Sequence, residues 1–550
     1  MKDRLVMLLL LVSAWLPMRA ADFDDLLPRP AHAVATGGSV VLPHGMKIAV
    51  RGLDDAMKAE VGRFAGSLND VTGLGAVVIG GIGGGFMTVV YDGTLPTEGY
   101  RLKIARDSIE IGASAPAGLY YAFQTIKKLL PANVIAGKPA AGPQTYSLPQ
   151  GEVTDMPRYE YRGFMLDVSR HFFDVDEIKK MLDLMAVYRL TRFHWHLTDD
   201  QGWRLPVAKY PELTKAGATN RNILRSDFAS QRQWRDGENA VYGPYSYTAD
   251  DIRAIVNYAR ERHIEVIPEV DMPGHMVAAI NAYPEFSTDP GSEKTALHED
   301  FSHEIWNKGG VSRDVLDVSN PRAVQFAKDV VDALADLFPY EYIHIGGDEC
   351  PTLAWEHSEA CRAKMAELGL DDARALQSWF TREIADYART RHGRKVMGWN
   401  EIVSEGNVDM DMIKAIDPVI FCWIGGEKES EDNGLKFVYT PFNGGYYINR
   451  SYKGHDSIGA VGDGTLSVTI GVNPPDMANC IGVQGTFWTE QVDRPEDLEY
   501  LALPRLLGIA EQGWSHERDK DYDDFLRRVG LETEYLRLGG YNYGAHQLVK

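Results

Sequence analysis

The sequence predicts a (β/α)8 TIM barrel preceded by a small α+β domain. Three observations lead to this fold class. From Arg158 onward, short apolar runs alternate with segments of helical periodicity over about 350 residues. Counting the apolar runs gives eight strands. Carboxylates, histidines and tryptophans follow the ends of these strands, where a barrel of this kind carries its active site.

Composition narrows the class of protein. The chain has 550 residues, of which 44% are hydrophobic and 25% charged, so it can bury sizeable cores. Disorder, collagen and coiled coil are excluded. The 57 Lys and Arg residues against 78 Asp and Glu give a net charge of −21. This balance repels phosphate backbones, so nucleic acid is not an expected partner.

The first 21 residues read as a secretory signal peptide. Lys2 and Arg4 precede an apolar run from Leu5 to Leu16, and the small residues Ala20 and Ala21 come shortly after it. The run is shorter than the ~20 residues of a membrane span. An uncleaved anchor or a buried first helix is the alternative. We expect cleavage near Ala20 and a periplasmic or secreted protein whose mature chain has no membrane span.

Residues 22–155 are expected to form the small α+β domain. Apolar alternation predicts short strands, and one later segment has helical periodicity. The strands are Met46–Val50, Met87–Tyr91 and Tyr100–Ile104, and the helix is Gly118–Leu130. The proline-rich segment Pro139–Pro157 is interpreted as the linker to the barrel.

Residues 156–515 are expected to form the barrel. Its strands are Gly163–Val168, Arg192–Leu197, Ile264–Val270, Tyr342–Ile345, Lys395–Trp399, Val419–Trp423, Phe437–Thr440 and Ile481–Trp488. Helices are predicted over Asp176–Tyr188, Ala249–Arg262, Pro321–Leu337, Ala373–Arg391 and Pro495 to about Gln512. The intervals Thr219–Ser246 and Tyr283–Ser312 are long enough to be substrate-shaping loops. Residues 516–550 are expected to form a helical extension packed on the barrel.

Tryptophans at the strand ends are typical of a sugar pocket. Trp399, Trp423 and Trp488 each close a predicted strand, with acidic residues between them. Apolar faces of a pyranose pack on aromatic rings, while carboxylates and arginine bind its hydroxyls. The alternative for any single tryptophan is that it only caps the barrel core.

The adjacent acids Asp348 and Glu349 carry the strongest chemical signal. Two catalytic carboxylates of a glycosidase usually flank the scissile bond ~5–9 Å apart, which sequence neighbours do not easily achieve. An adjacent pair favours a division of labour, in which one acid protonates the leaving oxygen and the other binds a different substrate group. This arrangement suits the substrate-assisted route, in which a 2-acetamido oxygen is the nucleophile.

The histidines allow a second interpretation. His194 and His196, together with His275 and Asp348, could form a metal site of the amidohydrolase type. That type places its H-x-H on the first strand, whereas here it follows the second. His275 could equally fix the charge state of a carboxylate. We therefore expect neither a metal nor another cofactor.

Four motifs together resemble the family 20 glycoside hydrolases, the exo-acting β-N-acetylhexosaminidases. They are Asp167-Val-Ser-Arg170-His-Phe, His194-Trp-His-Leu-Thr-Asp-Asp-Gln-Gly-Trp203, Pro268-Glu-Val-Asp-Met-Pro-Gly-His275 and His344-Ile-Gly-Gly-Asp-Glu349. The likeness runs from about Arg158 to Ser515 and includes motif order. The amino-terminal region is similar to the small domain that usually precedes this barrel. The resemblance implies a glycan substrate with a terminal N-acetylhexosamine.

The resemblance also implies roles for individual residues. Glu349 would be the general acid and base, and Asp348 would hold the acetamido N–H, with its charge raising the pKa of Glu349. Tyr447 would donate to the acetamido oxygen. The remaining implied residues are Arg170 on O3 and O4, Asp199 and His275 in a relay to Glu349, Trp399, Trp423 and Trp488 as walls, and Glu490 on a distal hydroxyl. Such a pocket implies exo-cleavage with retention of configuration.

One position departs from the family pattern. Many members carry Asp two residues after the catalytic tyrosine, whereas this chain has Asn449 followed by Arg450. Exchanging an anion for a cation beside O6 should favour a 6-sulfate. Members that handle 6-sulfated N-acetylglucosamine look similar here, so acceptance of that sugar is a hypothesis, and the alternative is that Arg450 points to solvent.

The cysteines permit one local disulfide. Cys350 and Cys361 are eleven residues apart, and in an exported protein they could close a small loop behind Glu349. Cys422 and Cys480 are expected to be buried and unpaired.

Two other functions stay open at this point. One is a metal-dependent amide or deacetylation hydrolase that uses the histidines, and the other is a non-catalytic glycan-binding barrel. The intact acid pair argues against the second. The sequence carries no signal for an oligomeric state.

Overall fold

A computed structural model describes residues 22–80, 84–140, 142–221, 240–289, 303–307, 310–452, 458–459, 464–516 and 520–548. Eight parallel strands close into a barrel, as predicted. They are β8 (Tyr161–Asp167), β9 (Arg192–His196), β14 (Glu265–Glu269), β15 (Tyr342–His344), β16 (Lys395–Trp399), β17 (Val419–Cys422), β18 (Phe437–Tyr439) and β19 (Cys480–Phe487). The predicted signal peptide and most of the two long loops lie outside the described residues.

Successive side chains of a barrel strand point alternately into two separate cores. In β8, Tyr161 and Met165 point into the barrel, where they pack with residues of the facing strands such as Phe421. Phe164 and Leu166 belong instead to the larger core between the strands and the surrounding helices. Because both faces of the strand are covered, every residue of β8 is buried. The continuous apolar runs in the sequence reflect this double burial.

Helices on the outside complete the β/α units. The main ones are α4 (Val175–Val187), α5 (Ala249–Arg260), α7 (Pro321–Leu337), α10 (Ala373–His392), α12 (Met410–Ile416), α13 (Glu427–Asp432), α15 (Pro495–Ala502) and α16 (Arg505–Trp514). Smaller elements are α6 (Val277–Ala282), α8 (Leu353–His357), α9 (Glu359–Leu368), α11 (Glu401–Ser404), α14 (Leu466–Gly471), and the short pairs β10 (Thr198–Asp199) with β11 (Gly202–Trp203) and β12 (Asn220–Arg221) with β13 (Val241–Tyr242).

Side-chain caps fix several helix starts. Asp174, Thr248 and Asp372 each accept backbone N–H bonds at the beginning of α4, α5 and α10. The single helix predicted from Pro495 to about Gln512 is wrong, because the chain forms α15 and α16 there. Pro504 separates them, since a proline has no N–H to continue the helical hydrogen bonds.

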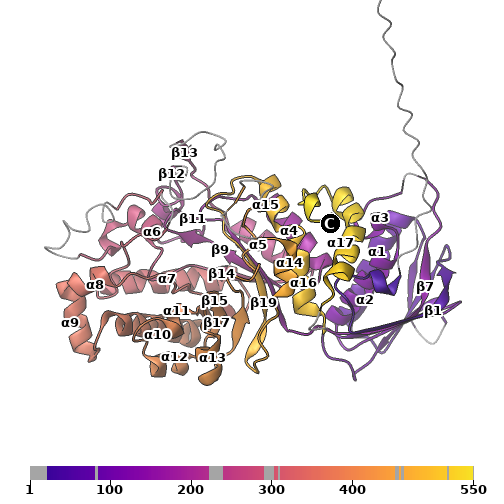
Figure 1. Ribbon diagram of the computed structural model, residues 1–550, viewed down its shortest axis with the longest axis horizontal. Helices are drawn as coiled ribbons and strands as arrows, with labels where there is room; N and C mark the ends of the chain where they lie inside the picture. The colour runs from indigo at the N-terminus through magenta and orange to yellow at the C-terminus, as the bar shows by residue number, and fades with distance from the viewer. Residues whose placement is uncertain are drawn as a thin grey trace, which may run out of the picture.

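The amino-terminal domain is a seven-stranded sheet in the order β1-β7-β5-β6-β4-β2-β3. Its strands are β1 (His32–Val41), β2 (Lys47–Arg51), β3 (Val77–Gly80), β4 (Met87–Tyr91), β5 (Tyr100–Ile104), β6 (Ile109–Ala113) and β7 (Ser147–Asp155). Its helices are α1 (Asp55–Thr72), α2 (Pro116–Leu129) and α3 (Ala132–Ile135). Figure 1 places this domain at one end of the molecule, with α1, α2 and α3 on the side of the sheet nearer the barrel.

The linker predicted over Pro139–Pro157 is wrong over half its length. β7 lies within it and pairs antiparallel with β1 and β5. Leu148 and Val153 of β7 enter the core of the domain. Pro149 is accommodated beside a register irregularity in β1, between Ala35 and Ser39. A proline therefore concealed a strand in the sequence.

A buried ionic junction joins the two domains. Asp155, at the end of β7, accepts hydrogen bonds from Arg189 Nη1 at 2.6 Å and from Trp514 Nε1 at 3.0 Å. The Tyr100 hydroxyl donates to the same carboxylate at 2.9 Å. The guanidinium of Arg189 also lies over the Trp514 ring, 4.3 Å from its centroid. Three separate parts of the chain thus meet on one carboxylate.

The C-terminal helix α17 (Tyr522–Gly539) strengthens the same junction. It lies against α3 (Figure 1), and Glu532 accepts from Lys128 of α2 at 2.8 Å and from Tyr188 at 2.9 Å. Arg528 pairs with Glu511 of α16 at 2.8 Å. The extension therefore contacts the amino-terminal domain as well as the helices of the barrel.

All four cysteines are buried free thiols. The proposed bridge between Cys350 and Cys361 is therefore wrong: the Cys361 Sγ instead lies 3.6 Å from Asp317 Oδ1, as a donor. Cys422 and Cys480 are buried and unpaired, as expected. Among the described helices, none combines the length and apolar character that crossing a membrane requires.

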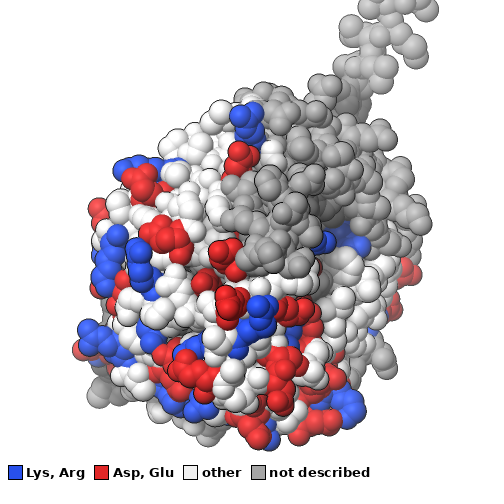
Figure 2. Space-filling model, turned by 90° about the vertical axis from the view of Figure 1, so that its left-hand side faces the viewer, with Lys and Arg blue, Asp and Glu red and all other residues white. Residues whose placement is uncertain are grey.

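Charges on the surface are mixed. Figure 2 shows the end of the molecule that carries α8 and α9, where acidic and basic side chains are interspersed. No extended basic patch appears among the described residues of this face. This distribution agrees with the net charge of −21.

Candidate active site

The turn after β15 places the acid pair. Gly346 and Gly347 have φ of 65° and 90°, which is left-handed backbone that favours glycine. A Cβ on Gly346 would lie 1.9 Å from Asp271 Oδ1, so no side chain fits there. The Gly347 N–H donates to that same Asp271 oxygen at 3.0 Å. Asp348 and Glu349 follow directly, and Glu349 itself has a strained φ of 43°.

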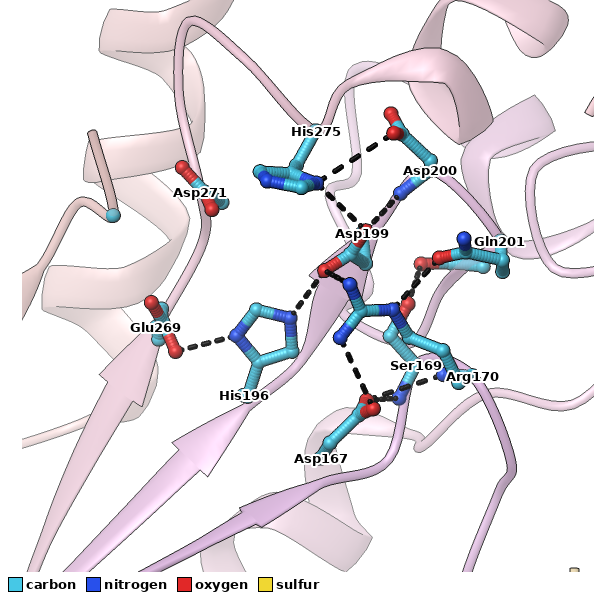
Figure 3. Close-up of polar contacts among 12 residues, drawn as sticks. Asp167, Ser169, Arg170, His196, Asp199, Asp200, Gln201, Glu269, Asp271 and His275 are labelled. Carbon is cyan, nitrogen blue, oxygen red and sulfur yellow. Dashed lines mark hydrogen bonds and ion pairs between the residues drawn. The ribbon is translucent and has the colours of Figure 1, made fainter. Parts of the chain in front are cut away.

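Arg170, which follows β8, is the centre of a group of polar side chains beside the acid pair (Figure 3). Its Nη2 donates to Asp199 Oδ2 at 2.7 Å, its Nε to Gln201 Oε1 at 2.7 Å, and its Nη1 to Asp167 Oδ2 at 3.2 Å. Its guanidinium carbon lies 4.9 Å from the centroid of the Trp488 ring. The side chain is held on all sides, so it presents a fixed positive charge to the pocket.

His275 connects the group around Arg170 to the acid pair Asp348 and Glu349. Its Nδ1 lies 3.1 Å from Asp199 Oδ1. Its Nε2 lies 3.9 Å from Asp348 Oδ2 and 3.6 Å from Glu349 Oε2, between the two acids. Burial lowers the pKa of His275, but the charge of Asp199 outweighs burial and raises it well above its ordinary value. The imidazole is therefore a cation at neutral pH.

Asp348 is held in its neutral form. It is 7% exposed, and burial together with the charge of Asp271 raises its pKa well above the ordinary value. Burial also raises the pKa of Asp271, to about 7. Both carboxyl groups therefore tend to hold a proton at a pH where exposed acids have lost theirs.

The expectation that Asp348 raises the pKa of Glu349 is wrong. Burial raises the pKa of Glu349, but the hydrogen bond and charge of His275, and then the charge of Arg170, outweigh it, so the pKa lies below its ordinary value. The side chain of Glu349 is 43% exposed, whereas that of Asp348 is 10% exposed.

A deeper layer supports Asp199. His196, at the end of β9, contacts Glu269 through Nδ1 and Asp199 Oδ2 through Nε2 at 2.8 Å (Figure 3). Burial lowers the pKa of His196, but Glu269 and Asp199 raise it to about 10. Glu269 also accepts from Trp399 Nε1 at 2.7 Å. The sequence suggested His196 only as a possible metal ligand and gave Glu269 no role, although both stand at strand ends, where functional side chains gather.

Aromatic rings surround the acids. Tyr447 is 6% exposed, and its ring centroid lies 6.1 Å from that of Trp423, with the two planes only 23° apart, and 6.5 Å from that of Trp488. Trp399 is 1% exposed and lies beneath Trp488, with centroids 5.9 Å apart. The three predicted tryptophans and Tyr447 therefore form one continuous wall.

Glu401 is a further acid at this wall that sequence reasoning did not select. It accepts from Trp423 Nε1 at 2.9 Å and is 7% exposed. Burial and then the charge of Asp348 raise the pKa of Glu401 to about 8. Its position two residues after Trp399 at the end of β16 was the available signal.

The remaining predicted residues lie at the edge of this cluster. Glu490 is half-buried, and Arg170 partly offsets the burial that raises its pKa. Asn449 is 5% exposed, and its Oδ1 has no hydrogen-bond partner within the described part of the chain. Arg450 is half-buried with its guanidinium 4.0 Å from the Phe442 ring centroid, and Phe442 in turn contacts Tyr447 with centroids 5.1 Å apart.

Three groups of side chains have the composition of a metal site. They are His194, Glu269 and His344; Asp199, Asp200 and His275; and Asp271, His275 and Asp348. In the first, Glu269 already bonds His196 and Trp399. In the second, Asp200 and Asp199 both face the Nδ1 of His275. In the third, His275 already contacts Asp199 through its Nδ1. These contacts are those of a hydrogen-bonded network.

Fold and site together define the class of protein: a glycoside hydrolase, whose barrel rim carries paired acids, an arginine and a tryptophan wall. Residues 159–517 match "Glycosyl hydrolase family 20, catalytic domain", and residues 24–156 match "Glycosyl hydrolase family 20, domain 2". The chain belongs to glycosyl hydrolase family 20.

Similar proteins share most of this chain. A "Beta-hexosaminidase" of Porphyromonas gingivalis is 36% identical over 82% of this chain, which spans 55% of that protein. One of Akkermansia muciniphila is 29% identical over 82% of this chain and 86% of its own length. The structure of Streptomyces plicatus N-acetyl-beta-hexosaminidase superposes with a TM-score of 0.76 and 28% identity, covering 96% of this chain and 97% of its own.

Proposed function

We propose that this protein is a retaining exo-β-N-acetylhexosaminidase that removes terminal β-linked GlcNAc or GalNAc from glycans. The observation that carries the proposal is the position of His275 Nε2, which lies 3.9 Å from Asp348 and 3.6 Å from Glu349, beside an aromatic wall. The names of the relatives, beta-hexosaminidase among them, support the same activity.

Glu349 is proposed as the general acid and base. The acetamido oxygen of the sugar attacks C1, the bond from C1 to the glycosidic oxygen breaks, and the Glu349 proton goes to the leaving oxygen. Water then attacks C1 of the oxazolinium intermediate and gives a proton back to Glu349. Two inversions at C1 retain the configuration. Its partial exposure leaves Glu349 accessible to both the leaving group and water.

Asp348 and Tyr447 are proposed to hold the acetamido group. An ionised Asp348 would accept the acetamido N–H and stabilise the positive charge that develops on it. The Tyr447 hydroxyl would donate to the acetamido oxygen and aim it at C1. Trp399, Trp423 and Trp488 would enclose the methyl group and the ring.

Substrate binding is proposed to move one proton. The pKa of Asp348 is raised and that of Glu349 is lowered, whereas the reaction needs an ionised Asp348 and a protonated Glu349. His275 carries a proton and lies between them. It can give its Nε2 proton to Glu349 and take that of Asp348, so the total is unchanged. Glu349 would then be protonated, and able to act as the acid, only when an acetamido N–H is bound to Asp348.

Arg170 and Glu490 are proposed to bind the far side of the sugar. Arg170, fixed by Asp167, Asp199 and Gln201, would donate to O3 and O4, and Glu490 would accept from a distal hydroxyl. Such contacts leave no room for a further residue at the non-reducing end, which gives exo-action.

The 6-substituent is proposed to include sulfate. Asn449 and Arg450 stand where many family members have an acid, and Arg450 lies on Phe442 beside Tyr447. A cation at this edge would attract an O6 sulfate, while a carboxylate would repel it.

Turnover of an aryl N-acetylglucosaminide tests the function. We expect Glu349→Gln to lower kcat/KM by about 10²–10⁴-fold, because it removes the transferable proton. Glu367→Gln, an exposed glutamate on α9, is the matched control and should change nothing. Retained glycan binding without any turnover in the native protein would favour the non-catalytic barrel. Activity abolished by EDTA and restored by metal would favour the metal-dependent amide hydrolase.

Export is also proposed, from the basic and then apolar first 21 residues. N-terminal sequencing of the protein from culture medium or a periplasmic fraction should give a start near Ala21. Recovery of the protein only in the cytoplasm with Met1 intact would contradict export.

A further inference from the structure

A hollow between the two domains has no lining residue in common with the candidate active site. It has a volume of about 700 Å³. Its walls are one face each of α1, α2 and α4, with the end of α5 and the chain around Tyr535 and Tyr541 closing the remaining sides. We call it the interdomain cleft. In the proposed mechanism it has no part.

Three lysines without a carboxylate partner line the cleft. They are Lys127 of α2, Lys138 after α3, and Lys179 of α4. Within the described residues, no carboxylate lies within ion-pair distance of any of them. The other three cations of the cleft are paired: Arg63 with Glu60, Lys180 with Glu499 and Arg262 with Asp183. The cleft therefore carries excess positive charge in a protein of net charge −21.

Lys127 is the least solvated of the three. Burial lowers its pKa to about 8, with Glu60 opposing that shift and Arg262 adding to it. Lys127 is half-buried, and a partly desolvated ammonium without a carboxylate partner costs free energy, which an incoming anion would recover. Lys179 is half-buried, with Nζ 5.5 Å from the centroid of the Tyr258 ring. The exposed acids of the cleft, Asp176 and Glu261, are at its rim.

Gln124 is an independent sign of a missing ligand. It lies between Tyr120 and Lys127 along α2 and lines the cleft. It is 7% exposed, and its carbonyl oxygen Oε1 has no hydrogen-bond partner among the described residues. An orphaned buried acceptor requires a donor such as a hydroxyl. Anionic oxygens cannot supply that donor, so a simple oxyanion would satisfy the lysines and leave Gln124 unsatisfied.

We infer that the interdomain cleft is a second carbohydrate site, which binds an anionic saccharide through Lys127 and Lys179 on its charged group and Gln124 on a hydroxyl. A sulfated or carboxylated sugar supplies both the anion and the donor. The inference deepens the proposed function, because it assigns an acidic glycan to an enzyme proposed to trim glycans. It also gives the amino-terminal domain a role in binding.

The test uses the full chain with Glu349→Gln, so that no glycan is turned over. The probes are a sulfated galactose disaccharide, its unsulfated counterpart and inorganic sulfate, followed by calorimetry. Galactose lacks the acetamido group that Asp348 and Tyr447 are proposed to hold, and the variants below distinguish binding in the cleft from binding beside Arg170 and Arg450. We expect one sulfated disaccharide per chain, and about tenfold or more weaker binding by the unsulfated sugar and by sulfate alone.

Variants locate the binding. Lys127→Met with Lys179→Met should weaken binding of the sulfated disaccharide at least about tenfold, and Gln124→Met should weaken it less. Lys414→Met, an exposed lysine on α12, should not. No binding of the sulfated disaccharide, or equal binding after both lysines are replaced, would overturn the inference. Sulfate alone binding as tightly as the disaccharide would reduce the cleft to an oxyanion site and also overturn it.

The outcome is separable from that of the proposed function. With Glu349 intact, the two lysine replacements should leave turnover of an aryl N-acetylglucosaminide unchanged and should not lower the melting temperature. Absence of turnover in the native chain would contradict the proposed activity and would leave the binding result to stand by itself.

Discussion

Glu269 and His196 form an ion pair inside the barrel, and neither side chain has any solvent exposure. The pair extends through Asp199 to Arg170 and His275, and Glu269 also holds the indole N–H of Trp399. One buried carboxylate therefore orients both the polar network around Arg170 and part of the aromatic wall. Because the charges alternate along this series of side chains, each side chain stabilises the ionised form of the next.

Replacing His196 should damage activity without touching the reacting atoms. His196→Gln leaves Glu269 and Asp199 without their shared cation, so Arg170 and His275 lose their alignment. We expect kcat/KM on an aryl N-acetylglucosaminide to fall by about 10–10²-fold, as small misplacements of catalytic groups do. His357→Gln, a half-exposed histidine on α8, is the control. An unchanged kcat/KM would contradict a positioning role.

The same substitution should alter how stability depends on pH. The pKa of His196 is raised from 6.5 to about 10 in the folded protein. Its charge therefore contributes stability that is fully present below pH 6.5 and is lost as the pH rises through 10. We expect the difference in melting temperature between the native protein and His196→Gln to be largest near pH 6 and to shrink toward pH 10. A difference independent of pH would show that His196 is neutral.

Arg450 should decide selectivity for a 6-sulfate. Arg450→Leu keeps the packing on Phe442 but removes the charge, so kcat/KM for a 6-sulfated aryl N-acetylglucosaminide should fall about tenfold relative to the plain sugar. Arg450→Lys should retain part of the preference. Arg382→Leu, an exposed arginine on α10, serves as the control. An unchanged ratio for Arg450→Leu would place the guanidinium outside the substrate's reach.

Asp155 should be critical for holding the two domains together. Asp155→Asn leaves Arg189 buried with an uncompensated charge and weakens the bonds of Trp514 and Tyr100. Removal of one partner of a buried pair costs about 3–5 kcal/mol. Denaturant unfolding should show this loss, whereas Asp107→Asn on the exposed surface should show none. A loss below about 1 kcal/mol would mean that water replaces the carboxylate.

The cysteines should behave as four protected thiols. Burial raises the pKa of Cys350 to about 12 and that of Cys361 to about 11, so neither reacts readily when the protein is folded. Alkylation without a reductant should add nothing to the native protein and four groups after denaturation. Only two additions after denaturation would indicate a bridge between Cys350 and Cys361.

The barrel was predictable because its strands are buried on both faces. Continuous apolar runs such as the one around Gly163 leave little doubt about strand or helix when a helical segment follows each of them. The strand β7 was not predictable in the same way, since Pro149 and the glycines around it read as a linker. Only pairing with β1 and β5 makes that segment a strand. Likewise, Pro504 divides a pattern whose apolar spacing runs on without a break.

The sequence by itself determined the fold class, the family and the residue types at the rim, because strand ends in a barrel meet at one face whatever the loops do. Only the tertiary structure decided the protonation of the acids. Asp271, Asp348, His275 and Glu349 come from two strand ends, and their pKa values depend on burial and on distances of a few ångströms that no spacing encodes. Adjacency predicted a raised pKa for Glu349, and the position of His275 reversed it.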